Sequence, residues 1–191
     1  MYAEYKIWGS EDGPEVTCLL QFKDDRQAIP QSLRPPSFVL LDGLELNADS
    51  SRYAGVFYER RFPAAAFAGK HTISHNNEED SFPESFDYLP FTLKEELPAS
   101  ISRSDFAVNL NNEGKGRFYL SLADTSFLSN DIYEEVTVRD GVLRLDTGQL
   151  NRLAGGPIVM ELIREEERRL KKPRGKLTIT YSLRREFELT D

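Results

Sequence analysis

The two histidines, His71 and His75, are the first candidates for acid–base or metal chemistry in this chain of 191 residues. Their neighbours Gly69, Thr72 and Ile73 favour a strand over a helix. On a strand, two residues four positions apart share a face but lie about 13 Å from each other, too far to hold one metal ion. We therefore predict structural or surface roles for both; the alternative is that one of them lies in a ligand site.

Other catalytic and ion-binding patterns are incomplete. The single cysteine, Cys18, excludes an internal disulfide and a cysteine-based zinc site. No Gly-x-Ser-x-Gly motif is present, and Gly114-Lys115-Gly116 has the spacing of a hairpin turn rather than of a phosphate-binding loop. Glu78-Glu79-Asp80 offers oxygen ligands without the alternating pattern of a calcium loop, so it predicts an exposed hairpin tip. The sequence thus predicts no enzyme, no catalytic residue, no metal and no cofactor.

A basic segment near the C-terminus is the clearest candidate for binding a partner. Seven cations fall within residues 164–176, interrupted by three glutamates. We predict partner contacts at Arg168, Arg169, Lys171 and Lys172, which could dock an acidic surface. The alternative is a solvated hairpin that keeps a sheet edge soluble.

Aromatic residues are a second candidate surface. Phe57 and Tyr58 point to opposite faces of a strand, so one of them lies away from the first core. Tyr58 is therefore a candidate contact with a partner or a sugar ring. The alternative is that these aromatics fill the core and the packing between domains, where they bury the most surface.

Composition and charge exclude several protein classes. The net charge of 24 − 32 = −8 leaves no basic excess for binding nucleic acid. An aromatic content of 11% is too high for a disordered chain, and no apolar run is long enough for a transmembrane helix. Residues 1–95 carry a net charge of 9 − 16 = −7, whereas residues 96–191 carry 15 − 16 = −1. This difference favours two modules.

The hydrophobic pattern has a period of two, which predicts strands. Alternating segments include Val16–Phe22, where Cys18 should point into the core with Val16, Leu20 and Phe22. Asp42-Gly43 and Asp140-Gly141 are typical of tight hairpin turns. The segment 157–172 is ambiguous, because residues 165–172 are strong helix formers. We predict a strand over 157–165, and helix in fewer than about a tenth of the residues.

A short internal repeat supports that strand. Phe67-Ala68-Gly69 aligns with Leu153-Ala154-Gly155, and each is followed by a charged stretch and an aromatic strand. Leu97-Pro98 breaks the strand pattern near 95–99 and predicts a linker. The chain then divides into domains 1–95 and 96–191, each the size of an immunoglobulin-like β-sandwich.

The Ala-Gly pattern before a late strand resembles the corner between the fifth and sixth strands of immunoglobulin-like domains. The chain as a whole resembles the tandem immunoglobulin-like modules of bacterial secreted or surface-anchored proteins, although it lacks the Cys-Trp-Cys core: Trp8 lies in the first strand and Cys18 has no partner. The resemblance implies an all-β fold and an extracytoplasmic, periplasmic or surface location. The residues after Met1 do not form a signal peptide, so the chain is either cytoplasmic or has lost a leader.

The function predicted from these features is non-catalytic. We expect an extracytoplasmic binding or adhesion module, or an envelope-associated structural module, whose partner is a protein or a glycan. The alternative is a polysaccharide-active enzyme or a carbohydrate-binding accessory module, which would need an aromatic surface or two facing carboxylates. The ligand and the oligomeric state are left open by the sequence.

Overall fold

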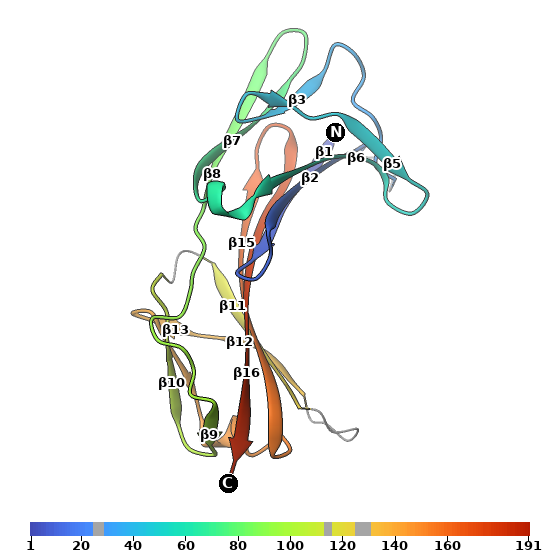
Figure 1. The fold of residues 1–191 in the computed structure, drawn as a ribbon. Coiled ribbons are helices and arrows are strands. Elements are labelled where there is room, and N and C mark those ends of the chain that lie inside the picture. The colour runs from blue at the N-terminus through green and yellow to red at the C-terminus, as the bar shows by residue number, and fades with distance from the viewer. Residues whose placement is uncertain (25–28, 113–115, 125–130) are drawn as a thin grey trace. The chain divides into compact units, whose positions relative to one another are not determined.

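Strands make up nearly all of the regular structure (Figure 1). A computed structural model describes residues 1–24, 29–112, 116–124 and 131–191. It has 63% of its residues in strands and 4% in helices, which confirms the all-β fold class and the low helix content. Gly114 and Lys115 of the predicted turn lie outside the described residues.

Two compact units divide the chain. Unit 1 comprises Met1–Gly9, Gly13–Leu89 and Glu167–Thr180, and unit 2 comprises Ser10–Asp12, Pro90–Glu166 and Tyr181–Asp191. The chain therefore enters unit 2 before the linker expected at 95–99, because Phe91 and Leu93 are buried there. The units also differ from the halves 1–95 and 96–191 in that residues 167–180 group with unit 1.

Unit 1 is built from two antiparallel groups of strands. One contains β1 (Tyr2–Ser10), β2 (Glu15–Lys23), β6 (Gly55–Pro63) and β5 (Ala48–Ser51), in that order, with β1 next to β16. The other has the order β4 (Leu44–Glu45), β3 (Phe38–Leu41), β7 (Gly69–Asn76) and β8 (Ser81–Tyr88). The short helix η1 (Ala64–Ala66) precedes β7.

The core of unit 1 lies between these two sheets. Phe22 of β2 packs edge-on against Tyr58 of β6 at 5.6 Å between centroids, and lies 5.5 Å from the ring of His75 on β7. Cys18 is fully buried, and the other inward residues of its strand are also buried, which confirms the predicted face: Val16, Leu20 and Phe22. The period-two alternation of β2 thus places one whole face in the core.

Unit 2 also contains two sheets. The larger has the order β12 (Ile132–Val136), β11 (Arg117–Asp124), β15 (Gly156–Leu170) and β16 (Arg174–Thr190), with β9 (Ser100–Ser102) parallel to β16. The smaller has the order β10 (Phe106–Asn109), β14 (Val142–Leu145) and β13 (Val138–Arg139). Phe91 is fully buried and packs edge-on against Phe118 and Tyr181. The only α-helix of the described residues is α1 (Thr147–Leu150).

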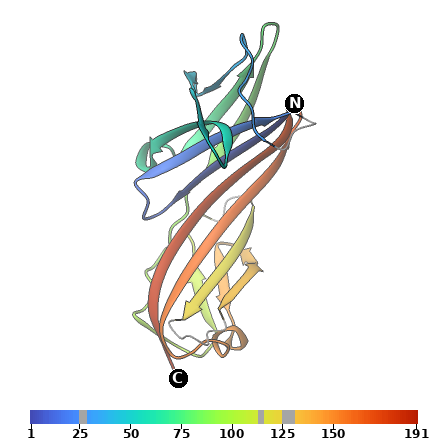
Figure 2. The ribbon, with the colours of Figure 1, turned by 90° about the vertical axis from the view of Figure 1, so that its right-hand side faces the viewer.

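The ambiguous segment after residue 156 is a strand, as predicted. β15 and β16 are 15 and 17 residues long and lie side by side (Figure 2). Ile158, Met160 and Leu162 are buried on alternate positions, and β15 pairs with β11 in the register Leu120↔Leu162. β11 pairs with β15 over residues 158–165, and β16 lies on the other side of β15. These hydrogen-bonded neighbours hold β15 extended despite its helix-forming end at 165–170, and residues 171–173 form the turn to β16.

Two sequence signals correspond to local geometry. Asp42-Gly43 and Asp140-Gly141 have positive φ at both residues, 50° and 79° in the first pair and 53° and 75° in the second, so they form the predicted tight hairpin turns. The repeat is also structural: Phe67 and Leu153 are both buried, each just after a short helix and before a strand.

Candidate functional site

The basic segment forms the connection between β15 and β16, and we call residues 167–176 the basic tip. In unit 1, Arg168 Nη1 donates a hydrogen bond of 3.2 Å to the carbonyl oxygen of Ser85 on β8, and lies 3.9 Å from Glu84 Oε1. Lys172 Nζ lies 5.8 Å from the centroid of the Phe82 ring on the same strand. The tip is therefore attached to β8 by two of the four cations predicted to bind a partner.

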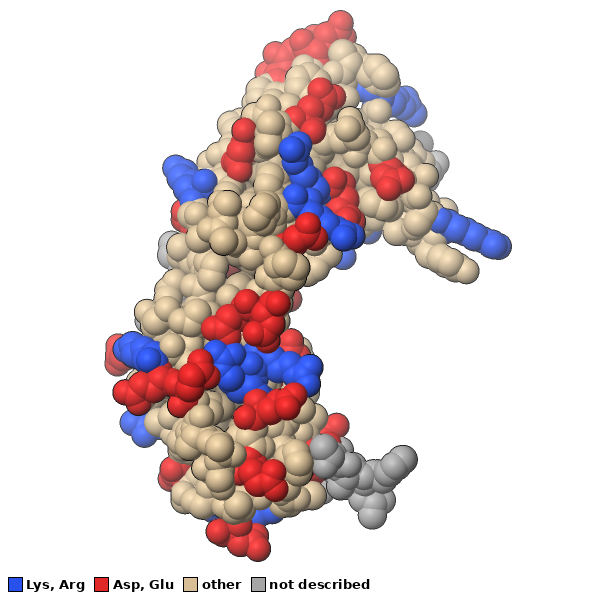
Figure 3. Space-filling view, in the orientation of Figure 1, with Lys and Arg blue, Asp and Glu red and all other residues tan. Residues whose placement is uncertain are grey.

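The remaining cations of the basic tip point to solvent. Arg169, Lys171 and Arg174 are exposed, and among the described residues no carboxylate lies within ion-pair distance of them. Lys176 differs, because its Nζ pairs with Glu167 within the tip. Figure 3 shows basic and acidic side chains interspersed over the face that it draws, and the chain as a whole carries a net charge of −8.

Tyr58, the aromatic predicted to contact a partner, is part of the core instead. Its side chain is only 6% exposed, and its hydroxyl oxygen accepts a hydrogen bond of 2.9 Å from the backbone N–H of Leu33. The physical reason is that the ring packs against Phe22 on the inner face of β6. In this position it removes more apolar surface from water than it would at an exposed site. Tyr58 is not available to a partner.

His71 is held between two oxygen acceptors. Its Nε2 donates to the carbonyl oxygen of Phe67 at 2.7 Å, and its Nδ1 lies 2.7 Å from Asp42 Oδ2. The imidazole also stacks on the Phe67 ring, with 3.9 Å between centroids and 9° between planes. These contacts give His71 a role in fixing the start of β7 to the β3–β4 turn.

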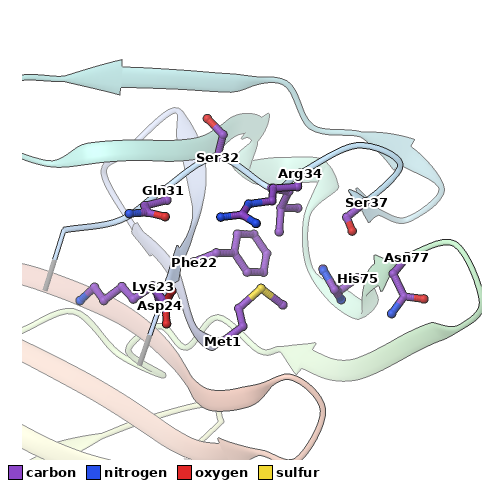
Figure 4. A pocket seen from close by; sticks show the side chains of 11 residues that line it. Met1, Phe22, Lys23, Asp24, Gln31, Ser32, Arg34, Ser37, His75 and Asn77 are labelled. Carbon is purple, nitrogen blue, oxygen red and sulfur yellow. The ribbon is translucent and has the colours of Figure 1, made fainter. Parts of the chain in front are cut away.

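His75, on the same strand, is in a different environment. It is 4% exposed and lies between Phe22 and Phe82, and neither ring nitrogen has a hydrogen-bond partner among the described residues. Burial lowers the pKa of His75 below its ordinary value, which keeps the ring neutral at pH 7. The ring lines a cavity of about 370 Å³ in unit 1 (Figure 4).

The acidic hairpin has the geometry of a turn. Asn77 Oδ1 accepts hydrogen bonds from the backbone N–H groups of Glu79 and Asp80 at 3.0 and 2.7 Å, closing the connection between β7 and β8. Across residues 1–24, 29–112, 116–124 and 131–191, no group of three or more His, Cys, Asp or Glu side chains is placed to hold a metal ion.

A pair of stacked tyrosines on unit 2, one exposed and one half-buried, was not singled out by the sequence. Tyr119 on β11 and Tyr133 on β12 have parallel rings, 6.0 Å between centroids and 4° between planes, and Tyr133 is 68% exposed. The signal was available, because Tyr119 alternates with the buried Phe118 and Leu120 and must face outward. The pairing of the two rings depends on the β11–β12 register, which sequence alone does not supply.

Comparisons with known proteins add little to this geometry. No family model and no curated protein matches the chain. Among solved structures it is similar to two tandem immunoglobulin fragments of titin, 10% and 14% identical with TM-scores of 0.29 and 0.26, each match covering all of both chains. An I-band fragment of titin is 12% identical with a TM-score of 0.26, over all of this chain and 64% of that one. Such values assign no activity or partner.

One structural observation concerns membrane-spanning helices. Within the part of the chain that the structure describes, no helix has the length and apolar character needed to cross a bilayer.

Proposed function

We propose that this protein is a non-catalytic, extracytoplasmic binding module whose basic tip contacts an acidic protein partner. The observation that carries the proposal is that some cations of the tip contact β8 whereas others are exposed. Arg168 and Lys172 contact β8, whereas Arg169, Lys171 and Arg174 are exposed and, among the described residues, have no carboxylate partner. A charged surface held in place by its neighbours loses less conformational entropy on binding than a mobile loop.

Electrostatics supports the same proposal. The protein has a net charge of −8, so the cations of the basic tip offer an acidic partner local attraction against a repelling background. Contacts of this kind mainly raise the association rate and weaken as salt increases. An extracytoplasmic location is part of the proposal because it follows from the resemblance to secreted β-sandwich modules.

The test uses poly-L-glutamate as an acidic polypeptide probe. We expect saturable binding that weakens between 20 and 300 mM salt, roughly as screening of exposed charges requires. The triple variant Arg169→Glu, Lys171→Glu, Arg174→Glu should bind at least about tenfold more weakly at low salt. The matched control, Arg52→Glu, Arg139→Glu, Arg144→Glu, changes the net charge equally at exposed positions elsewhere. Equal loss in both variants, or no binding by the natural chain, would contradict the proposal.

A second candidate function rests on the stacked pair of Tyr119 and the exposed Tyr133. Parallel aromatic rings on a sheet face offer apolar surfaces on which sugar rings can stack, which favours a carbohydrate-binding accessory module. Tyr133→Ala should then abolish binding of cellohexaose or laminarihexaose. Tyr53→Ala is the matched control, because Tyr53 is 95% exposed outside this pair. Retained glycan binding in Tyr133→Ala would exclude this surface.

A further inference from the structure

The cavity beside His75 contains an unsatisfied polar group. Both nitrogens of the His75 ring are buried without a hydrogen-bond partner among the described residues, although nearly all buried polar groups in proteins are paired. A neutral imidazole presents one donor and one acceptor. The ring lines the cavity, but its nitrogens are closed to it in this structure, so an occupant can satisfy them only when the ring turns toward the cavity.

The wall of the cavity opposite β7 is fixed by hydrogen bonds. The backbone N–H of Gln31 donates to the carbonyl oxygen of Phe22 at 2.8 Å, and that of Leu33 donates to the Tyr58 hydroxyl at 2.9 Å. Tyr58 is itself buried, so this segment is tied to the core at two points. The space is thus formed by the fold, and its volume of about 370 Å³ is in the range of small-molecule sites.

The charged side chains around the cavity differ in whether they form an ion pair. Lys23 Nζ is paired with Glu4 at 2.8 Å, and Asp24 contributes an opposing carboxylate. Arg34 is exposed, and among the described residues no carboxylate pairs with it. Figure 4 shows Arg34, Phe22 and His75 lining the cavity from different sides. The lining therefore combines one available cation, one aromatic wall and one unsatisfied imidazole.

We propose that this cavity binds a small organic anion, with its anionic group on Arg34, its apolar body against Phe22 and a polar group hydrogen-bonded to His75, whose ring turns toward the ligand on binding. Each group of the ligand is complementary to one residue of the lining. The guanidinium favours a carboxylate, the aromatic ring favours a flat or aliphatic body, and the imidazole supplies a donor or an acceptor. The site lies in unit 1 and is independent of the basic tip proposed to bind a protein.

Three probes separate these contributions. 4-Hydroxybenzoate has a carboxylate, an aromatic body and a hydroxyl, benzoate lacks the hydroxyl, and phenol lacks the carboxylate. With only two histidines in the chain, the ring nitrogens of His75 can be followed by ¹⁵N NMR with His71 as an internal reference. We expect 4-hydroxybenzoate to shift the His75 signals in a saturable way, to leave His71 unchanged, and to bind more tightly than either fragment.

Variants decide whether the cavity is responsible. Arg34→Gln should weaken 4-hydroxybenzoate binding about tenfold, because a charge-assisted hydrogen bond is lost. Arg52→Gln, at an exposed position outside the cavity lining, should leave it unchanged. The proposal is overturned if no probe shifts His75 saturably, as expected when the ring stays closed to the cavity, or if Arg34→Gln binds as tightly as the natural chain. Because Arg34 is exposed, its variant should fold even where a His75 variant does not.

Discussion

Oδ2 of Asp42 lies 2.7 Å from Nδ1 of His71, and the other oxygen of the same carboxylate accepts a hydrogen bond of 2.8 Å from the backbone N–H of Thr72. One side chain at a hairpin turn therefore secures two consecutive residues of β7. Asp42 also has a positive φ of 50°, which aspartate and asparagine tolerate better than most residues. The turn and the strand are joined by this residue.

Substitutions at Asp42 should separate these effects. Asp42→Asn keeps the backbone tolerance and an oxygen for Thr72, so we expect a loss in the free energy of unfolding of about 1 kcal/mol or less. Asp42→Ala removes both hydrogen bonds and should cost about 2 kcal/mol. Urea unfolding followed by fluorescence measures both values. Equal stability of the alanine variant and the natural chain would show that the pair contributes nothing.

The buried imidazole of His75 should make stability depend on pH. Because burial lowers the pKa of His75 in the folded chain, the unfolded chain takes up a proton near pH 6.5 while the folded chain does not. The free energy of unfolding contributed by this group is therefore fully present above pH 6.5 and falls as the pH drops below it. Lys23, Asp24 and Arg34 line the same cavity, and burial is the cause of the lowered pKa of His75.

The measurement compares urea unfolding at pH 7.5 and pH 5.0. In His75→Gln the loss of stability between these two values should be smaller than in the natural chain. His71→Gln serves as the control that removes the other histidine. An identical pH dependence in the natural chain and His75→Gln would rule out the expected role of this ring.

Gly175 lies at the start of β16 where another backbone approaches closely. A Cβ at this position would collide with the carbonyl oxygen of Ala3 on β1, and backbone cannot move aside as a flexible side chain can. Gly175→Ala should therefore destabilise unit 1 by about 2 kcal/mol or more. Gly43→Ala is a useful comparison, because a Cβ there meets no atom within 4 Å and only the positive φ of 79° opposes it. A thermal shift in which Gly43→Ala is the more damaging variant would count against this account.

The thiol of Cys18 should be inert in the folded protein. The residue is fully buried on the inner face of β2, and burial raises the pKa of its thiol, which suppresses the reactive thiolate. We expect native protein to react with Ellman's reagent only on the timescale of unfolding, and urea-unfolded protein to react at once. Cys18→Ser should lower the free energy of unfolding by roughly 1–3 kcal/mol, through a poorly paired buried hydroxyl. Rapid stoichiometric labelling of native protein would contradict the assignment.

The strands could be predicted from the sequence because they depend on residues that are neighbours along the chain. Alternation of Val16, Cys18, Leu20 and Phe22 identified the buried face of β2, and an Asp-Gly pair marked each tight turn. The repeat between Phe67-Ala68-Gly69 and Leu153-Ala154-Gly155 correctly favoured a strand over 157–165 against the helix-forming composition that follows. A period of two and a residue that accepts positive φ are local properties.

Other features were decided only by tertiary structure. Alternation shows that Phe57 and Tyr58 face opposite sides of β6, but only the hydrogen bond from Leu33 and the contact with Phe22 place Tyr58 in the core. The bond from Arg168 to Ser85 likewise joins residues 83 positions apart and places the basic tip in unit 1. The cavity at His75 arises in the same way, from the segment at Gln31 meeting β2 and β7. Contacts between distant residues are set by which sheet covers which face, and periodicity along one strand carries no information about that choice.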